Sequence, residues 1–244
     1  MANRLYDRLR KSIFKRLRKP AVRTVDGIRL TLNPAHALDR SLYIGHVAEQ
    51  PQIDRMLRIV DDWRPQVFLD IGANIGLYAL RLAAAGVAEI HAFEPVKATF
   101  DQLSQNIALN DWEDRIAAHH CAAGAEELQM TIDIDPATPD VSTLARAAHM
   151  DRWNFTEQET VIVKPLDALF DWAGRRILLK IDVEGFEVDV IAGAVRLLDE
   201  NDCCLQIEAF PQNRDATIAR MAELGYDAVD LIGNDYLFER RRPA

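Results

Sequence analysis

An alternation of strand-like and helix-like segments between residues 67 and 208 constrains the fold of this chain most. Short apolar runs, rich in β-branched residues, are each followed by a longer segment of helix-forming residues. This order predicts an α/β fold: a mostly parallel sheet with right-handed crossovers, which binds its ligand at the carboxyl ends of the strands. Two closing strands at 227–231 and 236–239 are predicted to pair as an antiparallel hairpin. The other predicted strands are 67–71, 89–93, 117–122, 177–183 and 204–208, and the predicted helices are 76–85, 97–110, 187–198 and 216–224.

The regions outside this alternation divide the chain. Residues 1–20 form a basic segment that ends at a proline, and residues 21–64 contain a hairpin signal, Asp26-Gly27, followed by a helical cap. The main domain is predicted at residues 65–244, with an insertion at 125–164 that has two strand-like pieces around a proline-containing polar stretch. Long insertions of this kind often act as lids or substrate loops.

Charge is distributed unevenly along the chain. The formal net charge is −9, yet residues 1–23 hold nine Lys and Arg against one acid, so the rest carries −17. A body this acidic disfavours nucleic acid as a partner. Residues 1–19 have the pattern of a basic amphipathic helix on an anionic membrane surface, with packing on the domain or a frayed tail as alternatives. Three cysteines without a disulfide framework indicate a reducing, cytoplasmic compartment.

The turn after the first strand of the main domain, Asp70 to Gly76, predicts the class of ligand. A dinucleotide fingerprint beginning at Gly72 would need glycines at 74 and 77, where this chain has Asn74 and Leu77. A nicotinamide dehydrogenase is therefore disfavoured. The Asp70 carboxylate would repel phosphates but suits a ligand with ammonium and sulfonium charges. S-adenosylmethionine has both.

A second acid stands where ribose is expected. Glu94 ends the next strand in the sequence Phe93-Glu94-Pro95, and an acid there is placed to accept hydrogen bonds from ribose hydroxyls. Helix capping is the alternative for both Asp70 and Glu94. The two features together predict a nucleoside site.

The motifs DIGANIG, FEP and LLKIDVEGFE, in this order along the chain, resemble those of the FkbM family of S-adenosylmethionine-dependent methyltransferases. The resemblance runs from about residue 49 to residue 208. It implies a class I methyltransferase (Rossmann-like) fold with seven strands, and O-methylation of sugars, lipid-linked oligosaccharides or polyketides. By the same resemblance, Ala122 contributes backbone near the adenine, Glu49 matches an acid ahead of the core, and Ser142 matches a serine that touches substrate or donor. The donor-binding residues expected from the turn and the motifs are Asp70, Gly72, Ala73, Asn74, Gly76, Glu94, Pro95, Ala122 and Asp182.

Charged residues end the strand predicted at 177–183. Lys180 and Asp182 share one strand face, Glu184 follows, and Glu208 ends the neighbouring strand. A hydroxyl that attacks the donor methyl needs its proton accepted, and Asp182 is the first candidate for that base. Lys180 is expected to hold Asp182 ionised or to stabilise an alkoxide, and Glu184 and Glu208 complete the catalytic set. A structural ion pair is one alternative, and Mg²⁺ or Ca²⁺ held by the three acids is another.

Other residues receive lesser roles. Gly185 is expected to leave room for substrate or the donor methyl. Glu187 and Asp189 are interpreted as surface acids of the following helix. His46 and Glu49, with Tyr43, could reach over the site, although a structural role is also open for His46. At most one of His119 and His120 is expected to face inward.

These patterns predict a cytoplasmic O-methyltransferase that modifies a hydroxyl of a saccharide or glycolipid, such as a lipid-linked or cell-surface glycan. It would be peripheral on the inner face of the plasma membrane if the basic leader binds lipid. A polyketide or other small natural product is the alternative acceptor. A non-catalytic nucleoside-binding module is the alternative from another functional class.

Overall fold

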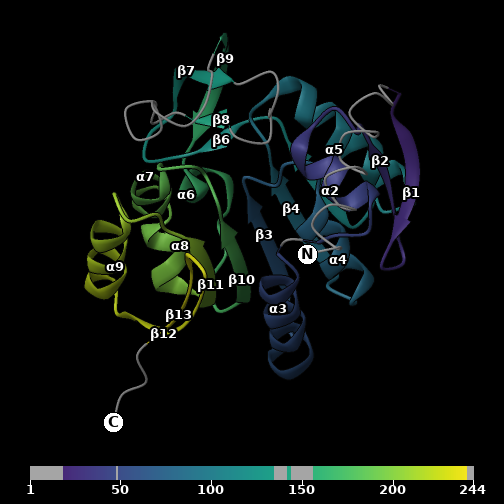
Figure 1. Cartoon of the computed structure of the whole chain (residues 1–244). Coiled ribbons are helices and arrows are strands. Elements are labelled where there is room, and N and C mark those ends of the chain that lie inside the picture. Colours follow the sequence, from purple (N-terminus) through teal and green to yellow (C-terminus); the bar gives the residue numbers. More distant parts are fainter. Residues whose placement is uncertain (1–18, 48, 135–141, 144–155, 241–244) are drawn as a thin grey trace, which may run out of the picture.

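The computed structural model describes residues 19–47, 49–134, 142–143 and 156–240. A seven-stranded sheet forms its centre, in the order β12-β13-β11-β10-β3-β4-β5 (Figure 1). The five strands from β11 to β5 are parallel, and β13 pairs antiparallel with both β11 and β12, so the predicted closing hairpin is confirmed. The strands are β3 (Val67–Ile71), β4 (Glu89–Phe93), β5 (Ile116–His119), β10 (Arg176–Ile181), β11 (Asp202–Glu208), β12 (Tyr226–Ile232) and β13 (Asp235–Arg240).

Apolar side chains alternate between the two faces of this sheet, as the period of a strand requires. Phe68 and Leu178 face one hydrophobic core with α3, α4 and α5, while Leu69 and Leu179 face another core with α6 to α9. Both faces are thus covered, which is the arrangement typical of a parallel sheet. The helices are α2 (Ala37–Tyr43), α3 (Gln50–Trp63), α4 (Leu77–Ala84), α5 (Lys97–Leu109), α6 (Leu166–Leu169), α7 (Glu187–Ala192), α8 (Val195–Glu200) and α9 (Arg214–Glu223).

The hairpin ahead of the main sheet forms as predicted. β1 (Ala21–Val25) and β2 (Ile28–Leu32) pair antiparallel, and both turn residues have positive φ, 46° at Asp26 and 88° at Gly27. That backbone is the one an Asp-Gly type I′ turn requires. In Figure 1 the hairpin lies beside α5. The backbone N–H of Thr31 in β2 donates to Asn106 Oδ1 of α5 at 2.7 Å.

A second, four-stranded sheet contains the described part of the insertion, in the order β6-β9-β7-β8. Its strands are β6 (Ala122–Ala123), β7 (Leu128–Ile134), β8 (Ser142–Thr143) and β9 (Glu157–Lys164). The prediction of one strand over 117–122 is wrong at its end, because β5 stops at His119 and β6 pairs with β9 instead. The Cys121 N–H donates back to the His119 carbonyl at 3.0 Å, and this tight turn takes the chain out of the main sheet.

The single helix predicted over 187–198 is broken in two. α7 ends at Ala192 and α8 begins at Val195. A Cβ placed on Gly193 would lie 1.9 Å from the Gly124 carbonyl oxygen, so the break lets two backbone segments approach more closely than side chains allow.

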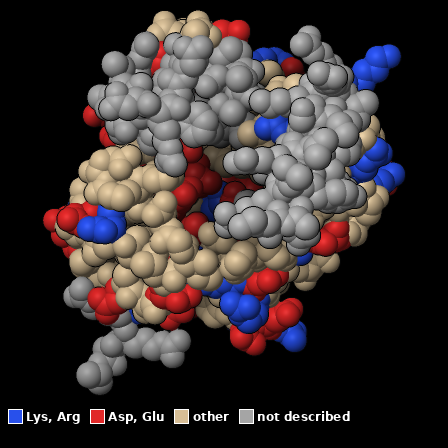
Figure 2. Space-filling model, in the orientation of Figure 1, with Lys and Arg blue, Asp and Glu red and all other residues tan. Residues whose placement is uncertain are grey.

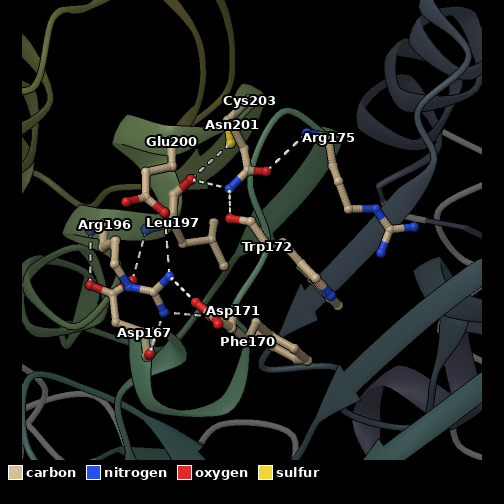
Figure 3. Close-up of polar contacts among 10 residues, drawn as sticks. All are labelled: Asp167, Phe170, Asp171, Trp172, Arg175, Arg196, Leu197, Glu200, Asn201 and Cys203. Atoms are coloured by element: carbon tan, nitrogen blue, oxygen red, sulfur yellow. Dashed lines mark hydrogen bonds and ion pairs between the residues drawn. The ribbon is translucent and has the colours of Figure 1, made fainter.

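A hydrogen-bond cluster fixes the loop between α6 and β10 (Figure 3). The buried Asn201 side chain accepts from the Arg175 N–H at 3.0 Å and donates to the carbonyls of Trp172 and Leu197 at 2.7 and 2.9 Å. Asp167 accepts the N–H of Leu197 at 2.8 Å near the start of α8. These contacts satisfy loop and helix-end backbone groups that would otherwise be buried without partners.

Candidate active site

A cavity of about 250 Å³ opens at the carboxyl ends of β3, β4, β10 and β11. In Figure 2 acidic side chains gather in a hollow, next to a basic side chain. The residues of the predicted sites that line this cavity are Glu49, Gly72, Ala73, Asn74, Glu94, Pro95, Ala122, Lys180, Asp182, Glu184 and Glu208. The structure therefore brings most of the predicted residues around one cavity. One set comes from the β3–α4 turn and the end of β4, another from the ends of β10 and β11, and Glu49 and Ala122 come from the starts of α3 and β6.

The turn after β3 owes its glycines to positive φ angles and to close contacts with neighbouring elements. Gly72 has a φ of 81°, and a Cβ there would lie 1.9 Å from the Asp182 carbonyl oxygen. Gly76 has a φ of 90° just before α4, where a Cβ would meet Leu103 at 2.6 Å. Asn74 adopts a φ of 51°, which asparagine tolerates better than most residues. The absence of a side chain at Gly72 lets the turn lie directly against the end of β10.

Asp70 is buried at the end of β3 and is not among the described residues that line the cavity. Its side chain is buried, and Oδ2 accepts the Ala79 N–H at 3.0 Å, whereas Oδ1 has no hydrogen-bond partner among the described residues. Burial raises the pKa of Asp70 to about 6, against the attraction of Lys180. A buried carboxylate oxygen without a partner is costly. The methionine ammonium of S-adenosylmethionine would satisfy it.

Glu94 lines the cavity and accepts hydrogen bonds from two backbone N–H groups. Oε2 accepts the Asn74 N–H at 3.0 Å and Oε1 accepts the Val96 N–H at 2.9 Å, at the residue that caps α5. Burial raises the pKa of Glu94 to about 7. Each carboxylate oxygen has a second acceptor position, so a Glu94 that braces the turn can also accept from ribose hydroxyls in the cavity that it lines.

Lys180 and Asp182 form the predicted pair at the end of β10. Lys180 Nζ donates to Asp182 Oδ2 at 2.8 Å, and the two side chains are 4% and 23% exposed. Burial would raise the pKa of Asp182, but the charge and hydrogen bond of Lys180, together with a hydrogen bond to Glu208, hold it below its usual value. Burial opposes the charge on Lys180, yet the neighbouring acids, Asp182 foremost, hold its pKa well above the usual value.

Glu208 lies at the end of β11, where its surroundings favour the neutral carboxylic acid. Burial, followed by the charge of Asp182, raises its pKa to about 10. Glu208 pairs in register with Asp235 on β13, whose pKa is also raised by burial. A neutral Glu208 can donate its proton in the hydrogen bond to Asp182, so one Asp182 carboxylate is supported by a lysine and a carboxylic acid.

Tyr78 and the polar residues behind it were not predicted. Tyr78, on α4, lines the cavity together with Glu49, the residue before α3, and its ring centroid lies 4.6 Å from Lys180 Nζ. On β11, Gln206 is the register partner of Lys180, and its Oε1 accepts from Arg55 Nη2 at 2.9 Å. The one available signal was polarity in otherwise apolar elements, since Tyr78 interrupts an alanine- and leucine-rich helix and Gln206 interrupts a buried strand.

One interpretation of the segment after β10 is wrong. Glu187 is not a surface acid: it is 0% exposed, and its Oε1 accepts the Gly185 N–H at 2.9 Å while Oε2 accepts from Asn213 of α9. Gly185 stands between two residues that line the cavity, and its φ of 103° is a backbone conformation that favours glycine, so its role in leaving room for substrate stays a prediction. Glu187 thus fixes the turn that carries Glu184 (φ 52°) into the cavity wall.

Of the remaining predicted site residues, Asp70, Gly76 and His46 are not among the described residues that line the cavity. His46 is exposed, its Nδ1 lies 3.1 Å from Ser41 Oγ, and it does not line the cavity. His119 stacks on Phe93 with ring centroids 4.4 Å apart, while His120 is exposed, in agreement with one inward-facing histidine. Ser142 lies on β8, where its backbone pairs with Ile134.

No group of three His, Cys, Asp or Glu residues that could hold a metal ion is found in the described parts of the chain. Within the same ranges, no helix is both long enough and apolar enough to cross a membrane.

Comparison with known proteins gives a consistent result. The model of the methyltransferase FkbM domain matches residues 70–228. Methyltransferase 1 of Beauveria bassiana is 27% identical over 189 residues, which cover 70% of this chain and 74% of that protein. Methyltransferase sdnD of Sordaria araneosa is 31% identical over 152 residues, 51% of this chain and 59% of that protein.

A solved structure shares the fold. It is the methyltransferase FkbM from Methylobacillus flagellatus KT, with a TM-score of 0.51 and 20% identity. The aligned part covers 72% of this chain but only 43% of that protein. The family match spans more than half of the chain and includes both the glycine turn and the charged end of β10. The chain belongs to the FkbM family of S-adenosylmethionine-dependent methyltransferases.

Proposed function

We propose that this methyltransferase modifies a hydroxyl group of a saccharide, most simply a glycolipid or a cell-surface glycan. The observation that carries the proposal is the Lys180–Asp182 pair, 2.8 Å apart and hydrogen-bonded to Glu208, beside the turn that would hold the donor. Carboxylates in a cavity accept hydrogen bonds from hydroxyl groups, and one of them can also accept the proton that the reacting hydroxyl must lose.

The residues that would hold the donor are those of the β3–α4 turn and the end of β4. Asp70 Oδ1 would accept from the methionine ammonium, and Glu94 would accept from the ribose. When bound, S-adenosylmethionine supplies a methyl group that its sulfonium sulfur makes electrophilic. The turn glycines keep the donor-binding backbone against β10, so that the acceptor and the donor can be aligned in one cavity.

Asp182 would take the acceptor proton. Because the hydroxyl oxygen becomes strongly acidic as it bonds to the methyl carbon, a carboxylate of low pKa is an adequate base. Lys180 keeps Asp182 ionised and oriented, and the neutral Glu208 carboxyl donates to it. Transfer therefore forms an oxygen–carbon bond, breaks the sulfur–carbon bond and leaves the proton on the Asp182 carboxylate.

Mass spectrometry of glycans and lipid extracts, from cells with and without the gene product, tests the proposed acceptor. Cells that express the Asp182→Asn variant serve as the matched control. The proposal predicts one added methyl on a defined sugar, present only with the unaltered protein. A methyl on a polyketide or other small natural product would contradict the saccharide assignment. Donor binding without any methylated product would support the non-catalytic nucleoside-binding alternative.

Membrane-surface binding by residues 1–19, which would bring the enzyme to a glycolipid on the inner face of the plasma membrane, remains a prediction. Residues 1–18 lie outside the described ranges. The support for it is their basic amphipathic pattern.

A further inference from the structure

The turn after β10, residues 183–186, forms part of the cavity wall. Val183, Glu184 and Phe186 all line the cavity. Glu184 adopts a φ of 52°, a left-handed conformation that residues other than glycine rarely take. A left-handed glutamate persists only where its surroundings hold it, and such residues cluster at functional sites. The contact that holds this turn therefore bears on what the cavity does.

Glu187 supplies that contact from the start of α7. Its side chain is fully buried, and Oε1 accepts the Gly185 N–H at 2.9 Å. The bond closes the turn onto the helix that follows, directly after the left-handed Glu184. Burial raises the pKa of Glu187 to about 7, so the neutral carboxyl is not strongly disfavoured near neutral pH. We therefore expect the turn to depend on the acceptor oxygen of Glu187 rather than on its charge.

The other carboxylate oxygen of Glu187 connects this turn to α9. Oε2 accepts from Asn213 Nδ2. Asn213 is the N-cap residue of α9, yet its side chain caps no N–H of that helix, although an asparagine at this position usually does. Its Oδ1 is buried and has no hydrogen-bond partner among the described residues. Asn213 therefore contacts Glu187 in place of capping its own helix.

This link joins two loops that end at the cavity. Glu208 ends β11, and the connection 209–213 leads from it to α9. Within that connection the Asn213 N–H donates to the Phe210 carbonyl at 3.0 Å. Glu187 thus holds the turn that carries Glu184 to the loop that follows Glu208. Both of its hydrogen bonds lie on the β10 and β11 side of the cavity rather than on the β3–α4 turn that would hold the donor.

We propose that Glu187 is a positioning residue for methyl transfer: it ties the turn 183–186 to α9 and so holds the Glu184 side chain against the acceptor. The inference rests on the proposed function, in which Asp182, the residue before this turn, takes the acceptor proton. The effect of Glu187 passes through Glu184. It should therefore appear in the use of the acceptor and not in the binding of the donor.

Transfer of a labelled methyl from S-adenosylmethionine into a glycan and lipid extract, taken from cells that lack the gene product, tests this. The initial rate at limiting extract reports kcat/KM for the acceptor, and the Kd for S-adenosylhomocysteine reports the donor site. Glu187→Ala should lower the rate about tenfold or more, because the turn is no longer held in place. The Kd should change by less than about threefold, since the donor residues keep their contacts.

Two further variants separate positioning from general stability. Glu184→Gly removes the side chain and the backbone strain together, so Glu187→Ala should have little further effect in that background. Glu187→Gln should recover most of the wild-type rate. Its Oε1 can still accept the Gly185 N–H, and its Nε2 can donate to Asn213 Oδ1 once the Asn213 amide has turned over.

Asp167→Ala is the matched control. Asp167 also accepts two backbone N–H groups at the start of a helix, those of Arg196 at 2.9 Å and Leu197 at 2.8 Å (Figure 3). It is not among the described residues that line the cavity. The control therefore loses a comparable pair of hydrogen bonds and should leave the rate unchanged. If Glu187→Ala fails to fold, Asn213→Ala takes its place, since it removes the link to α9 alone, and it should lower the rate about threefold or more.

The outcomes that overturn the inference differ from those that overturn the function. If wild type transfers no methyl to any component of the extract, the proposed function fails and the role of Glu187 fails with it. If wild type is active but the Glu187 variant keeps its rate, or lowers the rate equally with Glu184 present and absent, the positioning role alone is wrong. An equal loss in donor affinity would place the effect of Glu187 on the donor instead.

Discussion

Replacement of Lys180 by methionine tests the electrostatics of the cavity most severely. Lys180 is the only Lys or Arg among the described residues that line it, against five acids. The methionine side chain preserves much of the stem volume and removes the charge. The variant therefore leaves Asp182, at 23% exposure, without the partner that holds its pKa below the usual value.

The expected cost follows from the burial of the pair. Removal of one partner of a buried ion pair costs about 3–5 kcal/mol of unfolding free energy. This cost should depend on pH. In the folded variant the pKa of Asp182 is no longer held down by Lys180, so as pH falls Asp182 binds a proton while the same carboxyl in the unfolded chain is still ionised. Over the pH range in which the folded variant holds this proton and the unfolded chain does not, the free energy of unfolding rises by about 1.4 kcal/mol for each unit by which pH falls. The variant therefore recovers stability as pH falls. We expect a loss of about 3–5 kcal/mol at pH 8 and about 2 kcal/mol at pH 5.5, each relative to wild type at the same pH.

Urea unfolding at the two pH values measures both numbers. Lys97→Met is the matched control, since Lys97 pairs with Asp101 on the exposed surface of α5 with side chains 59% and 58% exposed. Exposed helical pairs of this kind contribute about 0.3–0.5 kcal/mol, so the control should change little at either pH. A loss below about 1 kcal/mol for Lys180→Met, equal at both pH values, would refute the description of a buried, charge-paired lysine.

Three further predictions concern other parts of the structure. Because burial raises the pKa of Asp70 to about 6, the affinity for S-adenosylhomocysteine should increase from pH 5 to pH 7 as the carboxyl ionises, and calorimetry of Asp70→Asn should show a weaker, flatter profile. If wild type shows no such dependence, Asp70 does not meet the ammonium. Asn201→Ala should cost about 2–4 kcal/mol in urea unfolding, since the Arg175 N–H and the Trp172 carbonyl lose their partners; a loss under about 0.5 kcal/mol contradicts this. Deletion of residues 2–19 should abolish cosedimentation with anionic vesicles, and undiminished binding would eliminate the membrane role of that segment.

Local patterns in the sequence were sufficient for much of the fold and the cavity. Asp26-Gly27 encodes the first hairpin because few other dipeptides accept two positive φ values. The strand–helix alternation encodes the parallel sheet, and the period of two places Lys180 and Asp182 on one face. Since the carboxyl ends of parallel strands meet at one edge, Glu94, Asp182 and Glu208 line one cavity although they are far apart in the chain.

The features that sequence reasoning missed depend on contacts between distant elements. Glu187 has the position of an exposed first-turn acid on α7, but Asn213 at the start of α9 packs against it and buries it. Gly193 breaks a helix because of the Gly124 carbonyl, about seventy positions earlier in the chain. Tyr78 resembles any core aromatic until Lys180 of a distant strand is placed against its ring. A pattern within one element carries no information about such partners.

The central claim is that the end of β10 handles the acceptor proton beside a separate donor site. The most direct measurement compares wild type with Asp182→Asn for transfer of a labelled methyl from S-adenosylmethionine to the acceptor found by mass spectrometry, together with the Kd for S-adenosylhomocysteine. Loss of a general base predicts a fall in kcat of about 10²–10⁴-fold, with the Kd changed by less than about threefold. An unchanged kcat would contradict the role of Asp182 as the base, and loss of analogue binding would place Asp182 in the donor site instead.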